Sequence, residues 1–181
     1  MAYEGLADRI EGRDTVLLLC DESNFREVAD RTTKQLLDEG RDGVFLTVDR
    51  SFREVEDDLE YLGADTEDLL YLDTVSSSRG ITTGREDVVL VNSPTSYNDI
   101  NLAVSDLMKE LSEEGFVLLD SFTSYLVYDD LGSVGDFVHR IFDKVSDSGR
   151  MFLMTAVKSQ MEDEALERCR EICGRSIDLT E

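Results

Sequence analysis

The fold is decided by residues 115–121, which read Gly-Phe-Val-Leu-Leu-Asp-Ser. Four apolar residues follow Gly115 without alternation, which is typical of a strand covered on both faces, as strands of parallel sheets are. Because open α/β sheets bind their ligands at the carboxyl ends of the strands, we expect Asp120 to lie at the candidate site. The alternative interpretation is that Asp120 is only the polar end of a buried strand.

Five glycines place this stretch in a larger pattern. Each follows a segment with helical periodicity and precedes an apolar run, which is the position of a glycine that ends a helix. These glycines are Gly40, Gly63, Gly115, Gly149 and Gly174. The repeated order of helix, glycine and strand predicts an α/β fold, a three-layer sandwich with a mostly parallel central sheet.

The apolar runs also predict where the elements lie. We expect strands near residues 15–20, 44–48, 69–72, 88–91, 116–119, 151–157 and 177–179. The expected helix starts are Ser23 or Asn24, Ser51 with a capping box to Glu54, about Asp99, Ser133 to Asp136, and Glu162. Residues 74–87 are expected to form an exposed, mobile loop, and residues 122–130 a link rich in Ser, Thr and Tyr. With 181 residues and no linker, repeat or low-complexity tract, residues 1–181 are expected to form a single domain.

The charge balance bears on the environment of the protein and on its partners. The chain has 41 acidic and 18 basic residues, a formal net charge of −23. Such a charge fits either a salt-loaded cytoplasm, where a Debye length of ~8 Å or less weakens self-repulsion, or a basic partner. We favour salt adaptation, and hence a halophilic archaeal origin, because the acidic residues are spread along the whole chain. No basic stripe is present to contact phosphates, so we expect no nucleic-acid partner.

The apolar runs also bear on membranes and export. The longest runs have only a handful of residues, far fewer than the roughly 20 that a spanning helix needs. The N-terminal residues Met-Ala-Tyr-Glu-Gly lack the basic and apolar regions of a signal peptide. We therefore expect a cytoplasmic protein that does not bind membranes.

The cysteines are candidates for a metal site. Cys169 and Cys173 lie one helical turn apart and could form half of such a site. No second pair accompanies them, because the remaining cysteine is Cys20 and the single histidine is His139. We therefore expect buried thiols and no bound metal.

Three stretches carry a resemblance to a known family. They are residues 43–49 (Gly-Val-Phe-Leu-Thr-Val-Asp), 62–65 (Leu-Gly-Ala-Asp) and 117–126 (Val-Leu-Leu-Asp-Ser-Phe-Thr-Ser-Tyr-Leu). These stretches resemble the RecA/KaiC-like ATPase domain of the P-loop NTPase superfamily. The block that runs from Asp120 to Ser124 is the most specific part, and the resemblance spans about residues 15–179.

The resemblance assigns roles to several residues. It implies a RecA/KaiC-like fold with Asp120 and Ser121 at the Walker B position, where the carboxylate holds Mg²⁺. It also implies that Thr155 and Lys158 are sensor-like residues near a nucleotide site. An ion pair between Asp120 and Lys158 is one open arrangement.

The phosphate loop of that family has no counterpart in this sequence. It should follow the first strand as G-x-x-x-x-G-K-[ST], whose backbone amides hold phosphate and whose lysine reaches the β and γ oxygens. The segment here is Asp21-Glu22-Ser23-Asn24, without glycine or lysine. A like-charge contact at ~4 Å costs roughly 1 kcal/mol in water and about 4 kcal/mol near a protein surface. We therefore interpret the segment as a degenerate phosphate loop and expect neither ATP nor Mg²⁺ to bind.

A second departure follows the strand at residues 44–48. KaiC-like enzymes carry adjacent acidic residues there that activate the attacking water, whereas this chain has Asp49 and Arg50. The resemblance therefore implies a vestigial catalytic-acid position. In this interpretation the protein has no catalytic residues.

These departures predict a pseudo-ATPase, a non-catalytic RecA/KaiC-like domain in regulation or signal transduction. The expected partner is a protein, either an active RecA/KaiC-like relative, a signalling protein or a second copy of the chain. Residues 74–87 and 122–130 are the expected contact surfaces.

Two alternatives stay open at this point. The first is a nucleotide-binding ATPase with an unorthodox site around Asp120, Asp49 and Lys158. The second is a receiver-like phosphoacceptor domain. Such a domain needs acidic residues, an aspartate that accepts the phosphoryl group, a residue with a hydroxyl group and a lysine. The residues that would supply them are Asp21, Glu22, Asp73, Thr155 and Lys158.

Overall fold

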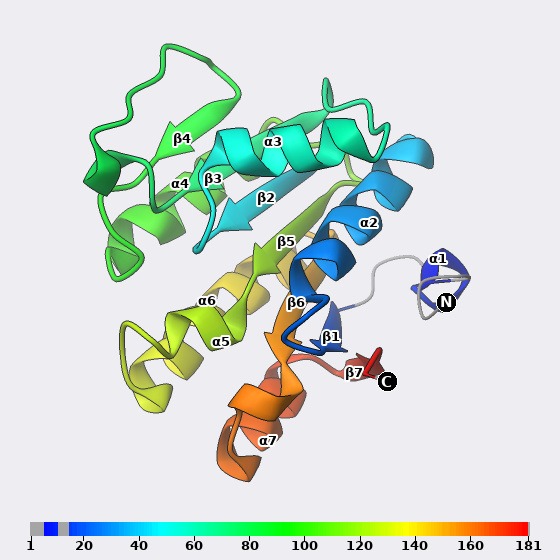
Figure 1. Cartoon of the computed structure of the whole chain (residues 1–181), viewed down its shortest axis with the longest axis vertical. Coiled ribbons are helices and arrows are strands. Elements are labelled where there is room, and N and C mark those ends of the chain that lie inside the picture. Colours follow the sequence, from blue (N-terminus) through cyan, green and yellow to red (C-terminus); the bar gives the residue numbers. More distant parts are fainter. Residues whose placement is uncertain (1–5, 11–14, 181) are drawn as a thin grey trace.

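The computed structural model describes residues 6–10 and 15–180. In this part of the chain seven strands form one sheet in the order β4-β3-β2-β5-β6-β1-β7, and every neighbouring pair runs parallel (Figure 1). The strands are β1 Thr15–Cys20, β2 Gly43–Thr47, β3 Leu69–Asp73, β4 Val88–Leu90, β5 Phe116–Asp120, β6 Met151–Val157 and β7 Arg175–Asp178. The predicted α/β class with a parallel sheet is confirmed.

Helices cover both faces of this sheet. In Figure 1, α2 and α3 lie in front of the sheet, and α4 and α6 lie behind it. The α-helices are α1 Leu6–Arg9, α2 Phe25–Asp38, α3 Phe52–Tyr61, α4 Tyr97–Met108, α5 Phe122–Tyr125, α6 Leu131–Asp147 and α7 Asp163–Ile172. Two short 3₁₀ helices are η1 Ser77–Arg79 and η2 Lys158–Gln160. In the described residues no helix has the length and hydropathy that crossing a membrane requires.

The strand β5 separates two hydrophobic cores. Val117 and Leu119 pack with α4 and α6, whereas Phe116 and Leu118 pack with α2 and α3. This division follows from the alternation of side chains along a strand. Gly43 on the neighbouring strand β2 makes room for the Phe116 ring, because a Cβ at Gly43 would lie 2.2 Å from that ring. The unbroken apolar run is thus the signature of a strand buried on both faces.

The local signals at helix ends are confirmed in part. The Ser51 hydroxyl accepts a hydrogen bond from the Glu54 amide (3.3 Å), and the Glu54 carboxylate accepts one from the Ser51 amide (2.7 Å), which completes the capping box. The helix α4 begins two residues before Asp99, and α6 begins at Leu131. The N-cap of α6 is Asp130, whose carboxylate accepts a hydrogen bond from the Ser133 amide at 3.0 Å.

Not every predicted helix-ending glycine adopts a left-handed conformation. Three of them do, with φ of 80° at Gly40, 78° at Gly63 and 75° at Gly149. Gly115 and Gly174 do not. Gly174 still directly follows the C-cap of α7 and precedes β7, as predicted, whereas Gly115 lies six residues after the C-cap of α4 and does not end that helix. Gly115 is instead required by close packing, because a Cβ there would lie 2.9 Å from an oxygen of Asp42.

The predicted link at residues 122–130 begins with a helix that the sequence analysis missed. Residues Phe122–Tyr125 form α5, and its side chains are buried. The Ser121 hydroxyl caps it by accepting a hydrogen bond from the Ser124 amide at 3.2 Å. A four-residue helix is too short for a visible apolar period, so the cap was its only signal.

The predicted loop at residues 74–87 is less exposed than expected. Its first three residues are buried, and η1 follows them. Near its end, the guanidinium of Arg85 donates two hydrogen bonds of 2.7 Å to Glu56 on α3 and contacts Asp87 at 2.6 Å. The guanidinium also lies 5.6 Å from the centre of the Phe52 ring. These contacts hold the loop against α3.

Candidate functional site

The carboxyl edge of the sheet brings Asp120 next to Thr155, as the order of the strands requires. Asp120 ends β5, and Thr155 lies on the neighbouring strand β6. The Thr155 hydroxyl donates a hydrogen bond of 2.8 Å to the Asp120 carboxylate. Asp120 is only 2% exposed, so this carboxylate sits inside the protein.

The cation next to Asp120 is Arg50. Its two terminal nitrogens contact three carboxylates that come from α2, α3 and β5. The contacts are Nη1 to Asp30 (2.9 Å) and Asp58 (2.8 Å), and Nη2 to Asp30 (2.8 Å) and Asp120 (3.2 Å). Arg50 is 1% exposed, and its Nε has no hydrogen-bond partner. We refer to Asp30, Arg50, Asp58, Asp120 and Thr155 as the Arg50 cluster.

The electrostatics of the Arg50 cluster follow from burial. Burial raises the pKa of Asp120 to about 6, although the Arg50 charge and the Thr155 hydrogen bond act in the opposite direction. Burial likewise raises the pKa of Asp30. Burial opposes the charge of Arg50, but the hydrogen bond to Asp30 and the charges of Asp120 and Asp30 outweigh it and raise the pKa of Arg50. The cluster therefore contains one permanent cation and more carboxylates than that cation can balance.

The segment between β1 and α2 closes on itself. The amides of Asn24 and Phe25 donate to the carbonyl of Asp21 at 3.2 and 3.1 Å. The Asn24 side chain accepts from the Asp21 amide at 2.9 Å, so Asn24 stands at the start of α2 but does not cap its amides. Glu22 and Ser23 are exposed. Three amides of this segment, those of Asp21, Asn24 and Phe25, are thus engaged within the turn.

Asp49 and Arg50 point to different partners. The Ser124 hydroxyl of α5 donates to the Asp49 carboxylate, and the Ser121 and Ser124 hydroxyls lie 2.7 Å apart. The sequence analysis placed Asp49 and Arg50 in one vestigial acid position. In the structure Asp49 contacts Ser124 within α5, whereas Arg50 contacts the helices on one face of the sheet.

Lys158 is not part of this site. Its ammonium contacts Asp178 on β7 at 2.5 Å, and both side chains are well exposed. The hydrogen bond from Lys158 lowers the pKa of Asp178 to about 2. The ion pair with Asp120 that the sequence left open does not form, because Arg50 occupies that place. Of the two sensor-like residues, only Thr155 contacts Asp120.

Asp73, the acceptor candidate of the receiver-like alternative, is fully buried. Its carboxylate accepts from the amides of Phe52 (2.7 Å), Val75 (2.7 Å) and Ser76 (2.8 Å) and from the Ser76 hydroxyl (2.5 Å). Each oxygen is thereby engaged by two donors. Asp73 joins the end of β3 to the start of α3, and a phosphodonor has no access to it.

The residues present do not fit the magnesium–nucleotide complex that the resemblance implies. One oxygen of Asp120 accepts from Thr155 and the other contacts Arg50. Within residues 6–10 and 15–180, no group of three or more His, Cys, Asp or Glu side chains is arranged to hold a metal ion.

Two members of the Arg50 cluster were missed by the sequence analysis. Asp30 and Asp58 lie on helices and were not distinguished from the other acidic residues of a highly charged chain. A signal did exist for Asp30, because it directly follows Val28 and Ala29 on the buried face of α2. A carboxylate on an apolar helix face requires a buried partner.

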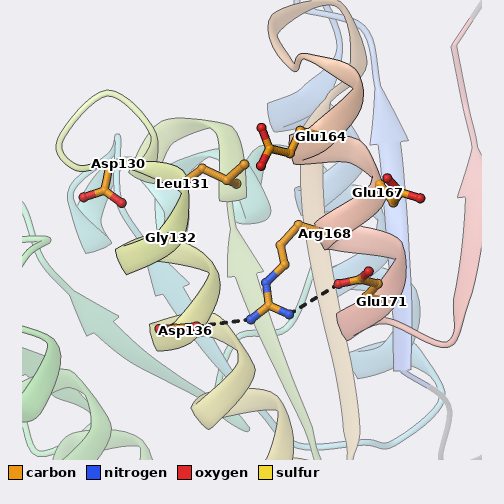
Figure 2. Close-up of a pocket in the computed structure, with 8 residues that line it drawn as sticks. All are labelled: Asp130, Leu131, Gly132, Asp136, Glu164, Glu167, Arg168 and Glu171. Carbon is orange, nitrogen blue, oxygen red and sulfur yellow. Dashed lines mark hydrogen bonds and ion pairs between the residues drawn. The ribbon is translucent and has the colours of Figure 1, made fainter.

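A second feature is a groove between α6 and α7, with a volume of about 630 Å³ (Figure 2). The residues that line it are Asp130, Leu131, Gly132, Asp136, Glu164, Glu167, Arg168 and Glu171. Arg168 bridges the two helices through contacts with Asp136 (3.3 Å) and Glu171 (3.5 Å). It lies across Gly135 of α6, where a Cβ would meet its Nε at 2.8 Å. The lining carries five carboxylates against one guanidinium, which already has two acidic partners.

Two exposed apolar side chains lie two and three residues before Asp130, which lines the groove. Val127 is 82% exposed and Tyr128 is 50% exposed, and both precede the groove residue Asp130 in the chain. The turn that carries them is fixed to α4, because the Tyr97 hydroxyl donates a hydrogen bond of 2.9 Å to Asp129. We refer to Val127 and Tyr128 as the apolar tip.

The three cysteines are free and buried, as expected. Burial raises the pKa of all three thiols, to about 12 for Cys173. The Cys169 thiol contacts the sulfur of Met161 at 4.0 Å. These side chains belong to the hydrophobic cores.

The solved structures with a similar fold include two from Pyrococcus horikoshii. The uncharacterized protein PH0321, crystallised in complex with an unknown peptide, has a TM-score of 0.73 and 14% identity, and the match covers 97% of this chain and 83% of that one. The KaiC-like protein PH0186 has a TM-score of 0.64 and 15% identity, with 93% of this chain and 73% of that one covered. At this identity the likeness shows the fold alone, which is KaiC-like.

No curated protein matches the chain by sequence. A family model, however, matches residues 1–181 and is described as a family of unknown function, DUF7090. The chain belongs to this family.

Proposed function

We propose that this KaiC-like domain is non-catalytic and acts in regulation or signalling by binding another protein. One observation carries the proposal: Arg50 and Thr155 engage both oxygens of the buried Asp120 carboxylate, at 3.2 and 2.8 Å. Both oxygens of this carboxylate already have a partner, so a magnesium ion would have to compete with the Arg50 guanidinium and the Thr155 hydroxyl. Catalysis at this edge would require the Arg50 cluster to break first.

The turn after β1 supports the same conclusion. Phosphate sites at the start of a helix use several converging backbone amides. Here the amides of Asp21, Asn24 and Phe25 bond within the turn. The unorthodox ATPase gains no support, because Asp49, Asp120 and Lys158 have three separate sets of partners.

For the protein-binding surface we propose the apolar tip and the adjoining groove between α6 and α7. The tip supplies exposed apolar area, and the acidic groove fits a partner segment that carries lysine or arginine. The crystallisation of PH0321 with a peptide adds support for peptide binding by a protein of this fold. This surface includes the end of the segment 122–130 and replaces its buried beginning as the expected contact region.

Calorimetric titration of the purified protein with Mg-ATP in concentrated KCl tests the non-catalytic assignment. We expect no saturable heat, and the same result for the Asp120→Asn variant. Stoichiometric binding in the micromolar range by the wild-type protein, lost in that variant, would contradict the proposal.

The binding surface is tested by comparing interaction partners of three immobilised proteins at native salt. These are the wild type, Tyr128→Asp in the apolar tip, and Tyr61→Asp on α3, where the native side chain is 92% exposed. We expect a basic protein to be retained by the wild type and by Tyr61→Asp and lost with Tyr128→Asp. Equal retention by all three would place the partner elsewhere.

A further inference from the structure

We propose that the groove, where α6 and α7 begin, takes one arginine side chain of the partner, while an apolar residue next to that arginine packs on the apolar tip. This inference rests on the proposed partner surface and names the partner side chains that the surface recognises. The residues at this end of the groove are Asp130 and Leu131 on one side and Glu164 on the other (Figure 2). We refer to these three residues as the arginine pocket.

The carboxylate of Glu164 is a surplus negative charge at this end of the groove. Each helix start is equivalent to about half a positive charge, which Asp130 at α6 and Glu162 and Asp163 at α7 already offset. In the described part of the chain no hydrogen bond or ion pair reaches the Glu164 side chain, whereas Arg168 contacts the acidic residues farther along the groove. The arginine pocket therefore attracts a cation that none of the described residues supplies.

Leu131 gives the arginine pocket an apolar wall. Figure 2 shows this side chain reaching from the start of α6 toward Glu164 on α7. Leu131 is only partly buried, although it packs on one of the hydrophobic cores. The methylene groups of an arginine can cover the exposed part of Leu131 while the guanidinium reaches Glu164, as long cationic side chains commonly do on apolar surface. The pocket thus suits a long side chain with a charged end.

Arg168 shows how an arginine lies between these two helices. Its guanidinium contacts Asp136 on α6 at 3.3 Å and Glu171 on α7 at 3.5 Å, and its side chain lies over Gly135. The arginine pocket likewise has a carboxylate from each helix and a glycine of α6, Gly132, among the residues that line the groove. A planar guanidinium can bond to two carboxylates at once, which an ammonium group does less well. We therefore assign the pocket to arginine rather than to lysine.

The apolar tip is close enough to contact the residue next to the arginine. Tyr128 and Asp130 are two residues apart in the chain, so their Cα atoms lie within about 7 Å of each other. Two neighbouring side chains of a partner span a similar distance. A second copy of this chain is a poor occupant, because each copy carries a formal net charge of −23 and the two would repel each other. The occupant is therefore a different protein with an exposed pair of apolar residue and arginine.

The test is an NMR titration of the nitrogen-15-labelled protein with the peptide acetyl-Gly-Leu-Arg-Gly-amide in KCl. We expect saturable shifts at the amides of Tyr128, Leu131 and Glu164, and weaker binding as the KCl concentration rises. Replacing the arginine by citrulline, which has the same shape without the charge, should abolish these shifts, and replacing it by lysine should weaken binding. Equal binding of the arginine peptide and either replacement would overturn the proposal, as would shifts that spread over the acidic surface without saturation.

Two matched variants locate the bound arginine. Glu164→Gln should weaken binding of the arginine peptide about threefold to fivefold, because exposed ion pairs are individually weak. Asp163→Asn removes the same charge from the same first turn of α7 but does not line the groove, so it should leave binding unchanged. Equal effects of the two variants would overturn the proposal, because the peptide would then respond only to the overall charge.

The retention experiment with Tyr128→Asp distinguishes a failure of this inference from a failure of the proposed surface. If a basic protein is retained by the wild type and lost with Tyr128→Asp while the peptide does not bind, the surface stands and the arginine pocket is wrong. If the peptide does not bind and the basic protein is retained equally by all three immobilised proteins, both proposals are wrong.

Discussion

The Arg50 cluster and the groove between α6 and α7 are both rich in carboxylates, yet they differ in nearly every physical respect. In the cluster, Arg50 is 1% exposed and joins α2, α3 and β5. In the groove, Arg168 is half-buried and has exposed acidic partners on α6 and α7. The first arrangement closes the edge of the sheet where α/β folds bind ligands, and the second leaves an open acidic surface.

The difference separates two roles of an arginine. A buried arginine that balances buried carboxylates is required for the fold, since its loss leaves charges without a partner or water. An exposed arginine among acidic residues contributes little stability, because water and salt screen each contact. This difference agrees with our proposal that the open surface, rather than the expected ligand edge, binds a partner.

The largest effect is expected for Arg50→Met. Removal of the guanidinium leaves Asp30 and Asp120 buried without their cation, which should lower the free energy of unfolding by about 3–5 kcal/mol. Urea denaturation in KCl measures this loss. Arg53→Met is the matched control, because Arg53 is exposed on α3 and should change stability by less than about 0.5 kcal/mol. A loss below about 1 kcal/mol in Arg50→Met would remove the distinction between the cluster and the groove.

A somewhat smaller effect is expected for Asp73→Ala, which tests a buried carboxylate held by backbone amides instead of a cation. The amides of Phe52, Val75 and Ser76 lose their acceptor, which should cost about 2–3 kcal/mol. The measurement is again urea denaturation, and hydrogen exchange should increase at these three amides. Asp73→Asn keeps one acceptor oxygen and should lose less stability than Asp73→Ala. Equal losses in the two variants would show that the charge of Asp73, and not its hydrogen bonds, determines its contribution to stability.

The pH dependence of stability should reveal the excess negative charge of the cluster. Because the pKa of Asp120 is raised from 3.8 to about 6, the folded chain binds a proton in this range that the unfolded chain releases. The free energy of unfolding should therefore fall by about 3 kcal/mol, from this group, as the pH rises from about 4 to above about 6. Denaturation at several pH values, compared with Asp120→Asn, isolates this contribution. The same slope in both proteins would show that Asp120 titrates normally.

The smallest effect is expected for Arg168→Met in the groove. Its ion pairs with Asp136 and Glu171 are largely exposed, so the loss should stay within about 1 kcal/mol. Thermal denaturation measures the change. The variant makes the groove more acidic, so a basic partner should bind it more tightly at low salt; weaker binding would show that Arg168 itself contacts the partner.

Much of the architecture could be predicted because its signals are local. The unbroken apolar run before Asp120, the capping box of Ser51 with Glu54, and the left-handed Gly40 each depend on a few consecutive residues. The family resemblance, rather than a local signal, placed Thr155 near the site that contains Asp120. The short helix α5 was missed because four residues are too few to show the apolar periodicity of a helix.

The Arg50 cluster could not be predicted from the sequence, although Arg50 itself was singled out. Its partners lie 20 residues before it, 8 after it and 70 after it. They meet only because α2 and α3 pack side by side on one face of the sheet. In a chain with 41 acidic residues, no local feature distinguishes Asp58 from its acidic neighbours.

The burial of the cysteines has a practical consequence for finding the partner. A thiol reacts through its thiolate, and burial together with raised pKa values suppresses that form at Cys20, Cys169 and Cys173. A cysteine introduced at Val127 would therefore be labelled selectively by a fluorophore or a photocrosslinker, with the native thiols left in place. The chain thus offers a ready attachment point beside the acidic groove for capturing whatever docks there.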